Sequence, residues 1–225
     1  MTSAAAGSRA ATGRASYDAA AFQRDTGVSR ETLARLGAYA ELLQKWNRAV
    51  NLVGRGTLAD LWRRHMLDSA QLMDLLPPAP ADRPRRVVDL GSGAGFPGLV
   101  LAVLGAGEVH LVEADGRKAA FLREAARATG ADVTFHVKRA ESLPALAADV
   151  VTARAFAPLA DLLGYAAPLL RPDGVGLFPK GKGVEGELTV ARKAWNMTVE
   201  RVPSRTDTAA TILRVEALVR KNAKG

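Results

Sequence analysis

The 225-residue sequence contains no cysteine. Its absence excludes disulfide bonds, thiolate metal sites and a cysteine nucleophile, and it is compatible with a cytoplasmic protein, which is what we expect. Uninterrupted apolar runs of about 18 residues are also missing, so we expect no transmembrane helix and no membrane partner. Histidine occurs only at His65, His110 and His136. Their spacing is not that of metal ligands, and we expect no metal site.

The N-terminal third divides into a tail, a helical segment and a linker. Residues 1–16 are small and polar and lack the apolar core of a signal peptide, which predicts a disordered tail. From Ser29, a plausible helix cap, to Leu76, apolar residues recur every three to four positions and predict two or three helices. Four prolines in residues 77–84 exclude a helix and mark a linker. We therefore expect a helical N-terminal cap and linker over 17–84, followed by one domain over 85–225.

Strand-like and helix-like segments alternate in that domain. We expect strands at 86–90, 108–113, 132–137, 148–153, 174–179, 196–202 and 211–218, and helices at 96–105, 116–129, 157–170 and 184–194. Such alternation predicts an α/β, Rossmann-like fold with a seven-stranded, mostly parallel sheet covered by helices on both faces. The last two strands, joined by residues 203–208, can form a hairpin that places one antiparallel strand in the sheet.

Positive charge is concentrated in the flanks of the chain, which has a formal net charge of +8. Residues 1–80 and 151–225 carry an excess of Lys and Arg, whereas residues 81–150 are balanced. This distribution fits a small-ligand site framed by surfaces that contact a polyanion such as a nucleic acid. An arginine-rich composition that arises from codon usage would give the same excess.

A glycine-rich loop follows the first expected strand, in the sequence Asp89-Leu-Gly91-Ser-Gly93-Ala-Gly95-Phe96-Pro97-Gly98. Glycines between a strand and a helix N-terminus expose backbone N–H groups to a ligand. The loop fits both a dinucleotide fingerprint and the D-x-G-x-G-x-G loop of S-adenosylmethionine (SAM)-dependent methyltransferases. Asp89 favours the second interpretation, because a carboxylate suits the cationic groups of SAM and repels a pyrophosphate. Asp89, Gly91 and Gly93 are therefore candidate cofactor-binding residues.

Polar residues at the ends of the later strands extend this candidate site. Glu113 lies where an acidic side chain can accept hydrogen bonds from ribose hydroxyls, unless it or Asp115 only caps the next helix. Ala140 and Glu141 lie where an adenine ring can bind, or they form an ordinary polar loop. Arg154 emerges at the expected substrate pocket, where it can hold an anionic group or pair with a nearby Asp.

Basic residues on both sides of the expected pocket are candidates for RNA binding: Arg63, Arg64, His65, Lys180 and Lys182. Lys180 and Lys182 are separated by glycine at the end of a strand and suit phosphate contacts, although a solvated turn explains the same residues. His65 can contact RNA, cap the cofactor pocket, or pair with Asp68 to hold the helical cap on the sheet.

Several motifs together resemble one family, the bacterial small-subunit (16S) ribosomal RNA guanine-N7 methyltransferases, also called glucose-inhibited division protein B. The resemblance extends from about Tyr39 to Gly183 and is carried by these segments: Lys45-Trp46-Asn47, Val50-Asn51-Leu52, Arg64-His65-Met66-Leu67-Asp68-Ser69, Asp89 to Gly98, Arg139-Ala140-Glu141, Arg154-Ala155 and Lys180-Gly181. It implies a helical cap on a class I SAM-dependent methyltransferase domain. It also implies SAM contacts at Gly91, Phe96, Ala140, Glu141 and Arg154, and a substrate of small-subunit ribosomal RNA, free or within a ribosomal particle. We expect the enzyme to be a monomer.

The absence of certain groups favours N7 of guanine as the target. Methylation of cytosine carbon 5 needs a cysteine, and methylation of exocyclic amines typically uses an Asn/Asp-Pro-Pro-aromatic motif where this chain has Thr152-Ala-Arg154-Ala-Phe156. N7 carries a free lone pair, so in-line displacement needs neither a protein nucleophile nor a general base, and we name no catalytic residue. The alternatives are an NAD(P)-dependent oxidoreductase, a small-molecule methyltransferase, and a non-enzymatic RNA-binding module.

Overall fold

A computed structural model describes residues 17–221 of the chain. Its centre is a seven-stranded sheet of order β3-β2-β1-β4-β5-β7-β6, in which only β7 runs antiparallel to its neighbours. The strands are β1 (Arg86–Leu90), β2 (Glu108–Val112), β3 (Val133–His136), β4 (Ala148–Ala153), β5 (Leu170–Lys180), β6 (Trp195–Pro203) and β7 (Thr211–Arg220). The predicted fold class and the predicted hairpin of the last two strands are confirmed.

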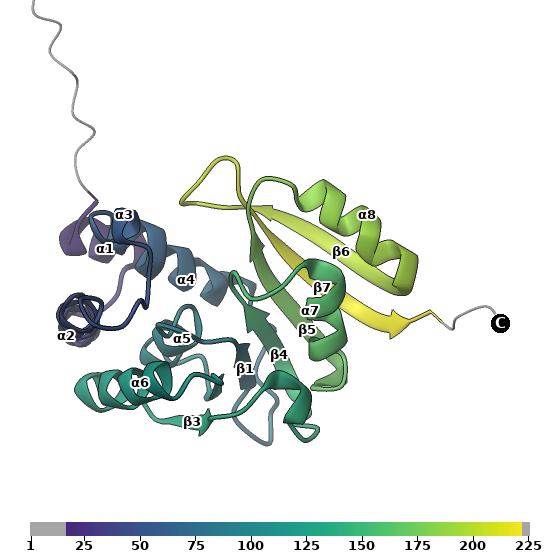
Figure 1. Ribbon diagram of the computed structural model, residues 1–225, viewed down its shortest axis with the longest axis horizontal. Coiled ribbons are helices and arrows are strands. Elements are labelled where there is room, and N and C mark those ends of the chain that lie inside the picture. Colours follow the sequence, from purple (N-terminus) through teal and green to yellow (C-terminus); the bar gives the residue numbers. More distant parts are fainter. Residues whose placement is uncertain (1–16, 222–225) are drawn as a thin grey trace, which may run out of the picture.

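Helices cover both faces of the sheet (Figure 1). They are α5 (Gly98–Val103) and α6 (Gly116–Thr129) on one face, and α7 (Leu159–Ala166) and α8 (Val184–Ala194) on the other. Alternate residues of a strand point to opposite faces, and accordingly Val87 and Val88 of β1 belong to two different hydrophobic clusters. The sheet is therefore the middle layer between two separate cores.

The helices before the sheet pack onto the layer of α5 and α6. They are α1 (Ala19–Thr26), α2 (Arg30–Trp46), α3 (Arg55–Leu58), a π-helical turn η1 (Trp62–Leu67), α4 (Asp68–Ala70) and a 3-10 turn η2 (Gln71–Leu75). Ser29 caps α2 as predicted, since its hydroxyl accepts a hydrogen bond from the backbone N–H of Thr32 at 3.0 Å. Leu36 and Tyr39 of α2 are fully buried in the same cluster as Leu101 of α5. One core thus continues from these helices into the sheet.

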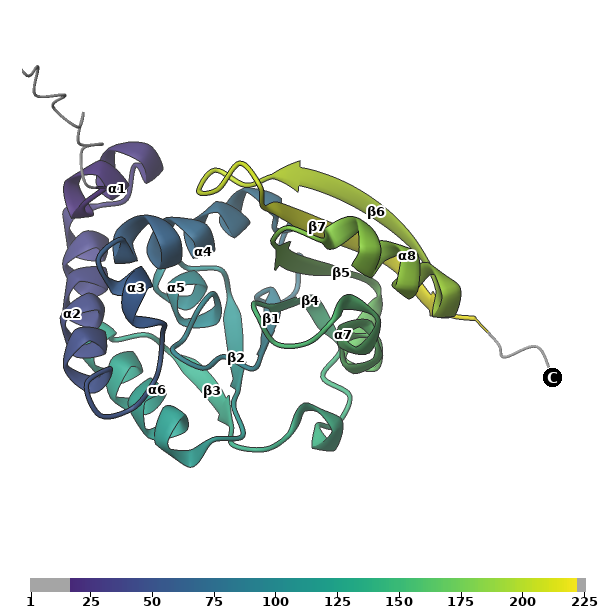
Figure 2. The ribbon, with the colours of Figure 1, turned by 45° about the horizontal axis from the view of Figure 1, so that its top comes forward.

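The loop between β6 and β7 reaches back to the N-terminal helices (Figure 2). The hydroxyl of Thr206 donates to Oδ1 of Asp68 at 2.8 Å, and the backbone N–H of Arg205 donates to Oε1 of Gln71 at the same distance. These two hydrogen bonds join the β6–β7 loop to the N-terminal helices above the carboxyl ends of the central strands.

A few boundaries differ from the predicted ones. Helix α7 begins only at Leu159, after Pro158 at the N-cap, so the predicted helix 157–170 is too long. Strand β5 begins at Leu170 and continues through Pro179, whereas the prediction covered 174–179. Helix α1 was not predicted at all. The predicted disordered tail, residues 1–16, lies outside the described residues.

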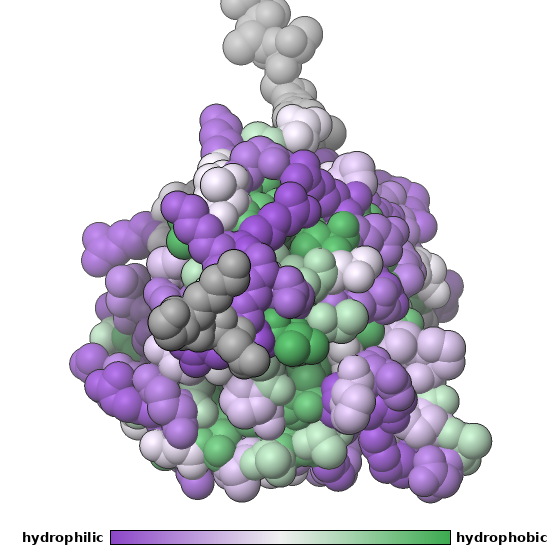
Figure 3. Space-filling model, turned by 90° about the vertical axis from the view of Figure 1, so that its right-hand side faces the viewer, coloured by the Kyte–Doolittle hydropathy of each residue, from purple (hydrophilic) through white to green (hydrophobic). Residues whose placement is uncertain are grey.

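The surface is mainly hydrophilic on the face shown in Figure 3, with hydrophobic residues in separate patches. Among residues 17–221, no helix is both long and apolar enough to cross a membrane. Within the same part of the chain, no group of three or more His, Asp or Glu side chains is arranged to hold a metal ion.

Candidate functional site

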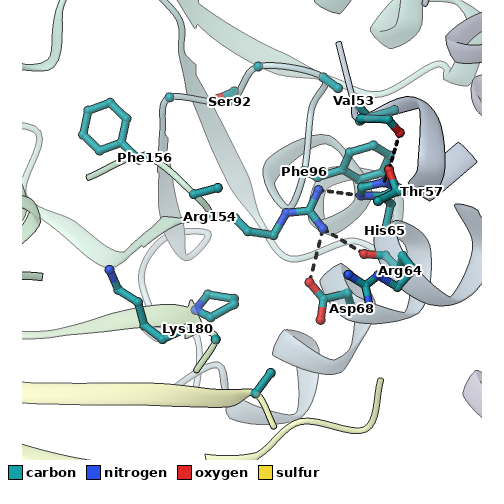
Figure 4. Close-up of a pocket in the computed structure, with 18 of the residues that line it drawn as sticks. Val53, Thr57, Arg64, His65, Asp68, Ser92, Phe96, Arg154, Phe156 and Lys180 are labelled. Carbon is teal, nitrogen blue, oxygen red and sulfur yellow. Dashed lines mark hydrogen bonds and ion pairs between the residues drawn. The ribbon is translucent and has the colours of Figure 1, made fainter. Parts of the chain in front are cut away.

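A cavity of about 960 Å³ opens at the carboxyl ends of β1, β4 and β5 (Figure 4). This is the edge at which open α/β sheets bind their ligands. Its lining comes from the N-terminal helices, the glycine loop, the segments after β4 and β5, and the β6–β7 loop: residues 52–54, 57, 64, 65, 68, 91–94, 96, 154–158, 179–181, 206, 207 and 210, with Lys118 and Glu187.

The glycine loop has a positive φ at each of Gly91, Gly93 and Gly95, with values of 65°, 55° and 90°. Such angles strain any residue that carries a Cβ. A Cβ at Gly91 would lie 2.3 Å from Cδ2 of Phe156, and one at Gly95 would lie 2.7 Å from the hydroxyl oxygen of Tyr39. A Cβ at Gly93 would meet nothing closer than the carbonyl oxygen of Gly91 at 3.6 Å. Gly93 therefore borders open space in the cavity wall.

Asp89 lies behind this loop rather than in the cavity. Its side chain is fully buried, and Oδ2 accepts a hydrogen bond from the backbone N–H of Gly98 at 3.1 Å, while Oδ1 has no partner among the described residues. Burial raises the pKa of Asp89 to about 7, although the hydrogen bond from Gly98 acts in the opposite direction. The expected direct contact between Asp89 and a cationic ligand does not match this geometry, because the carboxyl faces the first turn of α5.

Glu113 holds the glycine loop from the end of β2. One carboxylate oxygen accepts the N–H of Gly93 and the other accepts the N–H of Asp115, both at 2.8 Å. Asp115 itself caps α6, as the sequence analysis allowed. Ala140 and Glu141 form a short turn, η3 (Ala140–Ser142), and are absent from the cavity lining. Binding of ribose by Glu113 and of adenine at Ala140 and Glu141 stays a prediction.

Arg154, directly after β4, lines the cavity and is held by three acceptors from the N-terminal helices (Figure 4). Nη1 donates to the carbonyl oxygen of Arg64 at 3.0 Å and to Oδ2 of Asp68 at 3.2 Å, and Nη2 donates to Nδ1 of His65 at 2.8 Å. The guanidinium also lies over the ring of Phe96, 5.1 Å from its centroid. These contacts agree with the alternative in which Arg154 pairs with a nearby Asp, which is Asp68.

His65 is buried against Phe96, and the two ring centroids are 4.9 Å apart. Its second nitrogen, Nε2, lies 2.8 Å from the hydroxyl of Thr57. Burial and the positive charge of Arg154 lower the pKa of His65 to about 3, so the imidazole is neutral near pH 7. The expected pairing with Asp68 is wrong in detail, because Arg154 lies between the two side chains and contacts both.

The predicted RNA-binding lysines and arginines differ in their exposure and in the partners that they already have. Lys180 is nearly buried, and its ammonium donates to Oε2 of Glu187 at 2.7 Å and to the carbonyl oxygen of Ala157 at 3.0 Å. Lys182 is exposed. Arg64 is half-exposed at the cavity rim, 3.8 Å from a carboxylate oxygen of Asp207, whereas Arg63 lies over the ring of Tyr17 away from the cavity lining. Lys180 is thus poorly placed to contact a phosphate directly.

Several lining residues are not predicted from the sequence, among them Thr57, Asp68 as a partner of Arg154, Phe156 and Glu187. Asp68 lies in the same sequence motif as His65, and Phe156 lies two residues after Arg154. Their closeness to these two candidates could have indicated that they also line the site. Thr57 and Glu187 act through contacts with His65 and Lys180 that no spacing in the sequence reveals.

The strand order, the antiparallel seventh strand and the glycine loop facing the cavity together define the Rossmann-like methyltransferase class. Solved structures share this fold. A SAM-dependent methyltransferase from Aquifex aeolicus has a TM-score of 0.52 at 16% identity, over 68% of this chain and 92% of that one. A TehB-like SAM-dependent methyltransferase from Corynebacterium glutamicum has the same TM-score at 15% identity, over 83% of this chain and all of that one.

Sequence similarity identifies the particular family. The family described as rRNA small subunit methyltransferase G (GidB) matches residues 32–212. The ribosomal RNA small subunit methyltransferase G of Rhodospirillum centenum is 59% identical over 203 residues, 90% of this chain and 92% of that protein. Its counterpart in Rhodospirillum rubrum is 59% identical over 196 residues, 87% of this chain and 95% of that protein. The chain belongs to the GidB family of small-subunit ribosomal RNA methyltransferases.

Proposed function

We propose that this methyltransferase transfers the methyl group of SAM to N7 of a guanine in small-subunit ribosomal RNA by direct displacement, without a protein nucleophile. Family membership supports methyl transfer to this RNA. The donor, the target atom and the route of transfer are argued from the cavity. We further propose that the enzyme works as a monomer in the cytoplasm, where small ribosomal subunits are assembled.

One observation carries the choice of target: each carboxylate or imidazole that lines the described cavity already has a polar partner. His65 uses both ring nitrogens, and Asp68 accepts from Arg154 and Thr206. Glu187 accepts from Lys180 and from the N–H of Leu159, and Asp207 pairs with Arg64. A wall without a free base suits an acceptor atom that needs no deprotonation. Guanine N7 is such an atom, whereas an exocyclic amine is not.

The cavity wall fits the donor at the glycine loop. Gly93 leaves a space that a Cβ would fill, and Glu113 fixes the backbone N–H of the same residue from behind. We place the donor against Gly91, Gly93 and Phe96, with Glu113, Ala140 and Glu141 on its ribose and adenine side. Asp89 supports this wall through Gly98. Bound SAM would supply a methyl group that forms a bond to N7 as its bond to sulfur breaks, so the positive charge passes to the purine and no proton moves.

The residues of the chain then act by alignment. Arg154, Phe96 and His65 form a rigid wall opposite Lys180, which holds the loop after β4 through the carbonyl of Ala157. Alignment of reacting groups can lower a barrier by roughly 7–11 kcal/mol. For the RNA backbone, we retain Arg64 and Lys182 as phosphate contacts, and we assign Lys180 and His65 to the cavity wall.

Methylation of purified small ribosomal subunits and of free 16S RNA with isotopically labelled SAM tests the proposal. The RNA is then digested, and the modified nucleoside is identified by mass spectrometry. The expected product is 7-methylguanosine. A label on another atom of any base would overturn the assignment, and calorimetric binding of NADH in place of SAM would restore the oxidoreductase alternative.

The RNA surface has a separate test. Each lost phosphate contact should reduce the salt dependence of RNA binding by about one unit of slope. We therefore expect a smaller slope for Arg64→Ala and Lys182→Ala, and an unchanged slope for the matched control Lys193→Ala, which replaces an exposed lysine of α8 away from the cavity. Unchanged slopes in all three variants would remove Arg64 and Lys182 from the interface.

A further inference from the structure

Phe156 is the only aromatic residue among the large hydrophobic side chains that residues 17–221 expose. It is 36% exposed, and the other members of this set are Val137, Val190 and Val219. Phe156 alone of the four lines the cavity. Exposure of an apolar ring costs free energy, and its placement inside a ligand cavity therefore requires an explanation.

The ring is held in a defined place. One edge lies against the backbone of Gly91, where any Cβ would collide with it. The ring of Tyr165 in α7 packs edge-on at a centroid distance of 5.6 Å and an interplanar angle of 69°. The ring of Phe156 is therefore held between Gly91 and Tyr165.

The backbone that carries the ring is unusual. Ala155 has a φ of 51°, in the left-handed region that residues with a Cβ rarely adopt. Such conformations persist where the surrounding structure enforces them, and they cluster at ligand sites. The turn at Ala155 separates the two neighbouring side chains, so that Arg154 contacts the N-terminal helices while Phe156 stands apart from them (Figure 4).

The other phenyl ring of the described cavity wall, that of Phe96, is already occupied. Phe96 has His65 stacked on it and the guanidinium of Arg154 over it. Phe156 is thus the lining ring that the described residues leave open to a planar ligand, and it lies beside Gly91 of the proposed donor site. Enzymes that modify a base take it out of its stack and hold it by aromatic stacking.

We propose that Phe156 stacks on the unstacked target base of the RNA and positions it beside the methyl donor. This assignment rests on the proposed function, because it presumes RNA as the substrate and the donor at the glycine loop. The competing occupant of the same ring is the adenine of SAM. The two differ in which ligand loses affinity when the ring is removed.

The test compares Phe156→Leu, which keeps an apolar side chain without a π-face, with Phe156→Tyr and Phe156→Trp, which keep the stacking surface. Steady-state methylation of small ribosomal subunits gives kcat and KM for the RNA at saturating SAM, and calorimetry gives the Kd of SAM. We expect Phe156→Leu to lose about tenfold to hundredfold in kcat/KM for the RNA, as for other base–aromatic contacts, with the Kd of SAM within about threefold of the original. The Tyr and Trp variants should stay within about fivefold of the original in both quantities. Val190→Ala, at an exposed aliphatic site in α8 away from the cavity, serves as the matched control and should change neither.

The outcomes separate cleanly. If Phe156→Leu keeps full activity on RNA, the stacking role is refuted. If the Kd of SAM rises and kcat/KM for the RNA recovers at saturating SAM, the ring belongs to the donor site, and the proposal is also refuted. Failure of the proposed function has a different signature, since the unaltered enzyme would then methylate a different atom or none, which is established independently of Phe156. A stacked base other than guanine would leave the role of Phe156 intact.

Discussion

Nη2 of Arg154 lies 2.8 Å from Nδ1 of His65, and this contact joins the end of β4 to the N-terminal helices. Arginine only donates hydrogen bonds, so Nδ1 accepts and Nε2 carries the proton. Nε2 then donates to the hydroxyl of Thr57 at 2.8 Å, which donates onward to the carbonyl oxygen of Gly54 at 2.7 Å. The neutral imidazole thus has one fixed tautomer, and it ties the wall of the cavity to the loop before α3.

Replacement of His65 by Ala should therefore weaken both the fold and the activity. The change removes an acceptor from a charged, partly buried guanidinium and the ring stacked on Phe96. We expect the free energy of unfolding to fall by about 2–3 kcal/mol in urea titrations, with a lower kcat at saturating SAM. Thr57→Val, which removes only the hydroxyl partner, should cost about 1 kcal/mol. Unchanged stability of the Ala variant would mean that the contact contributes nothing to the fold.

Acidification should destabilise the protein through the same residue. Burial lowers the pKa of His65 to about 3 in the folded protein, from its ordinary value of 6.5 in the unfolded chain. Between these values the unfolded state binds the extra proton, so stability falls as the pH decreases from about 6.5 toward 3. Thermal unfolding followed from pH 7.5 to 5 should show that the original protein loses stability relative to His65→Gln, a comparison in which the opposite contribution of Asp89 cancels. Parallel profiles for the two proteins would contradict the assignment, since His136 titrates equally in both.

Local signals explain which parts of the fold were predictable from the sequence. Helix α6 was predicted with both ends correct, because Asp115 caps its start and Gly130 ends it with a φ of 60°. Strands β1 and β4 are short apolar runs bounded by linker or loop residues, and their limits agree with the prediction. Helix α1 has eight residues and only one buried apolar side chain, Phe22, so its pattern is too short to recognise.

Contacts between distant segments explain what the sequence could not reveal in the site. Asp68 joins Arg154 and Thr206, partners that are 86 and 138 residues away. Lys180 resembles a phosphate ligand in a Lys-Gly-Lys segment, yet Glu187 reaches it from the first turn of α8. The sequence correctly predicts that Arg154 and the glycine loop line the pocket, because both directly follow the end of a strand. Their partners depend on how the N-terminal helices dock.

Glu113 provides a test of the donor site. Its carboxylate accepts the backbone N–H groups of Gly93 and Asp115, so Glu113→Ala should release the glycine loop as well as any contact to ribose. Hydrogen bonds to charged groups contribute about 1.5–3 kcal/mol, and we expect the Kd of SAM to rise by about tenfold to hundredfold in calorimetry. Glu124→Ala, within α6, is the control and should bind SAM normally. An unchanged Kd for the Glu113 variant would exclude Glu113 from the donor site.

Asp89 should produce a pH dependence opposite to that of His65. Burial raises its pKa from 3.8 to about 7, so the folded protein retains a proton that the unfolded chain has already lost. Stability contributed by the protonated carboxyl is complete below about pH 4 and is lost as the pH rises to 7. Asp89→Asn keeps an acceptor for Gly98 and should gain stability relative to the original protein across this window, as measured by urea unfolding. Asp132→Asn, at an exposed site, should show no such gain. A constant difference between the Asp89 variant and the original protein would show that the buried carboxyl does not titrate there.

The three glycines of the loop are not equivalent, and two alanine substitutions separate their roles. In Gly95→Ala, the new Cβ would lie 2.7 Å from the hydroxyl oxygen of Tyr39 at a φ of 90°, so we expect a loss of about 2–4 kcal/mol in the free energy of unfolding. In Gly93→Ala, the Cβ meets no atom closer than 3.6 Å, and the positive φ alone should cost about 1–2 kcal/mol. The Gly93 variant should therefore fold, yet bind SAM at least tenfold more weakly, because its Cβ occupies space that the donor needs. If calorimetry instead finds the original affinity in a folded Gly93→Ala protein, the donor does not lie against this loop, and the open space beside Gly93 has another purpose.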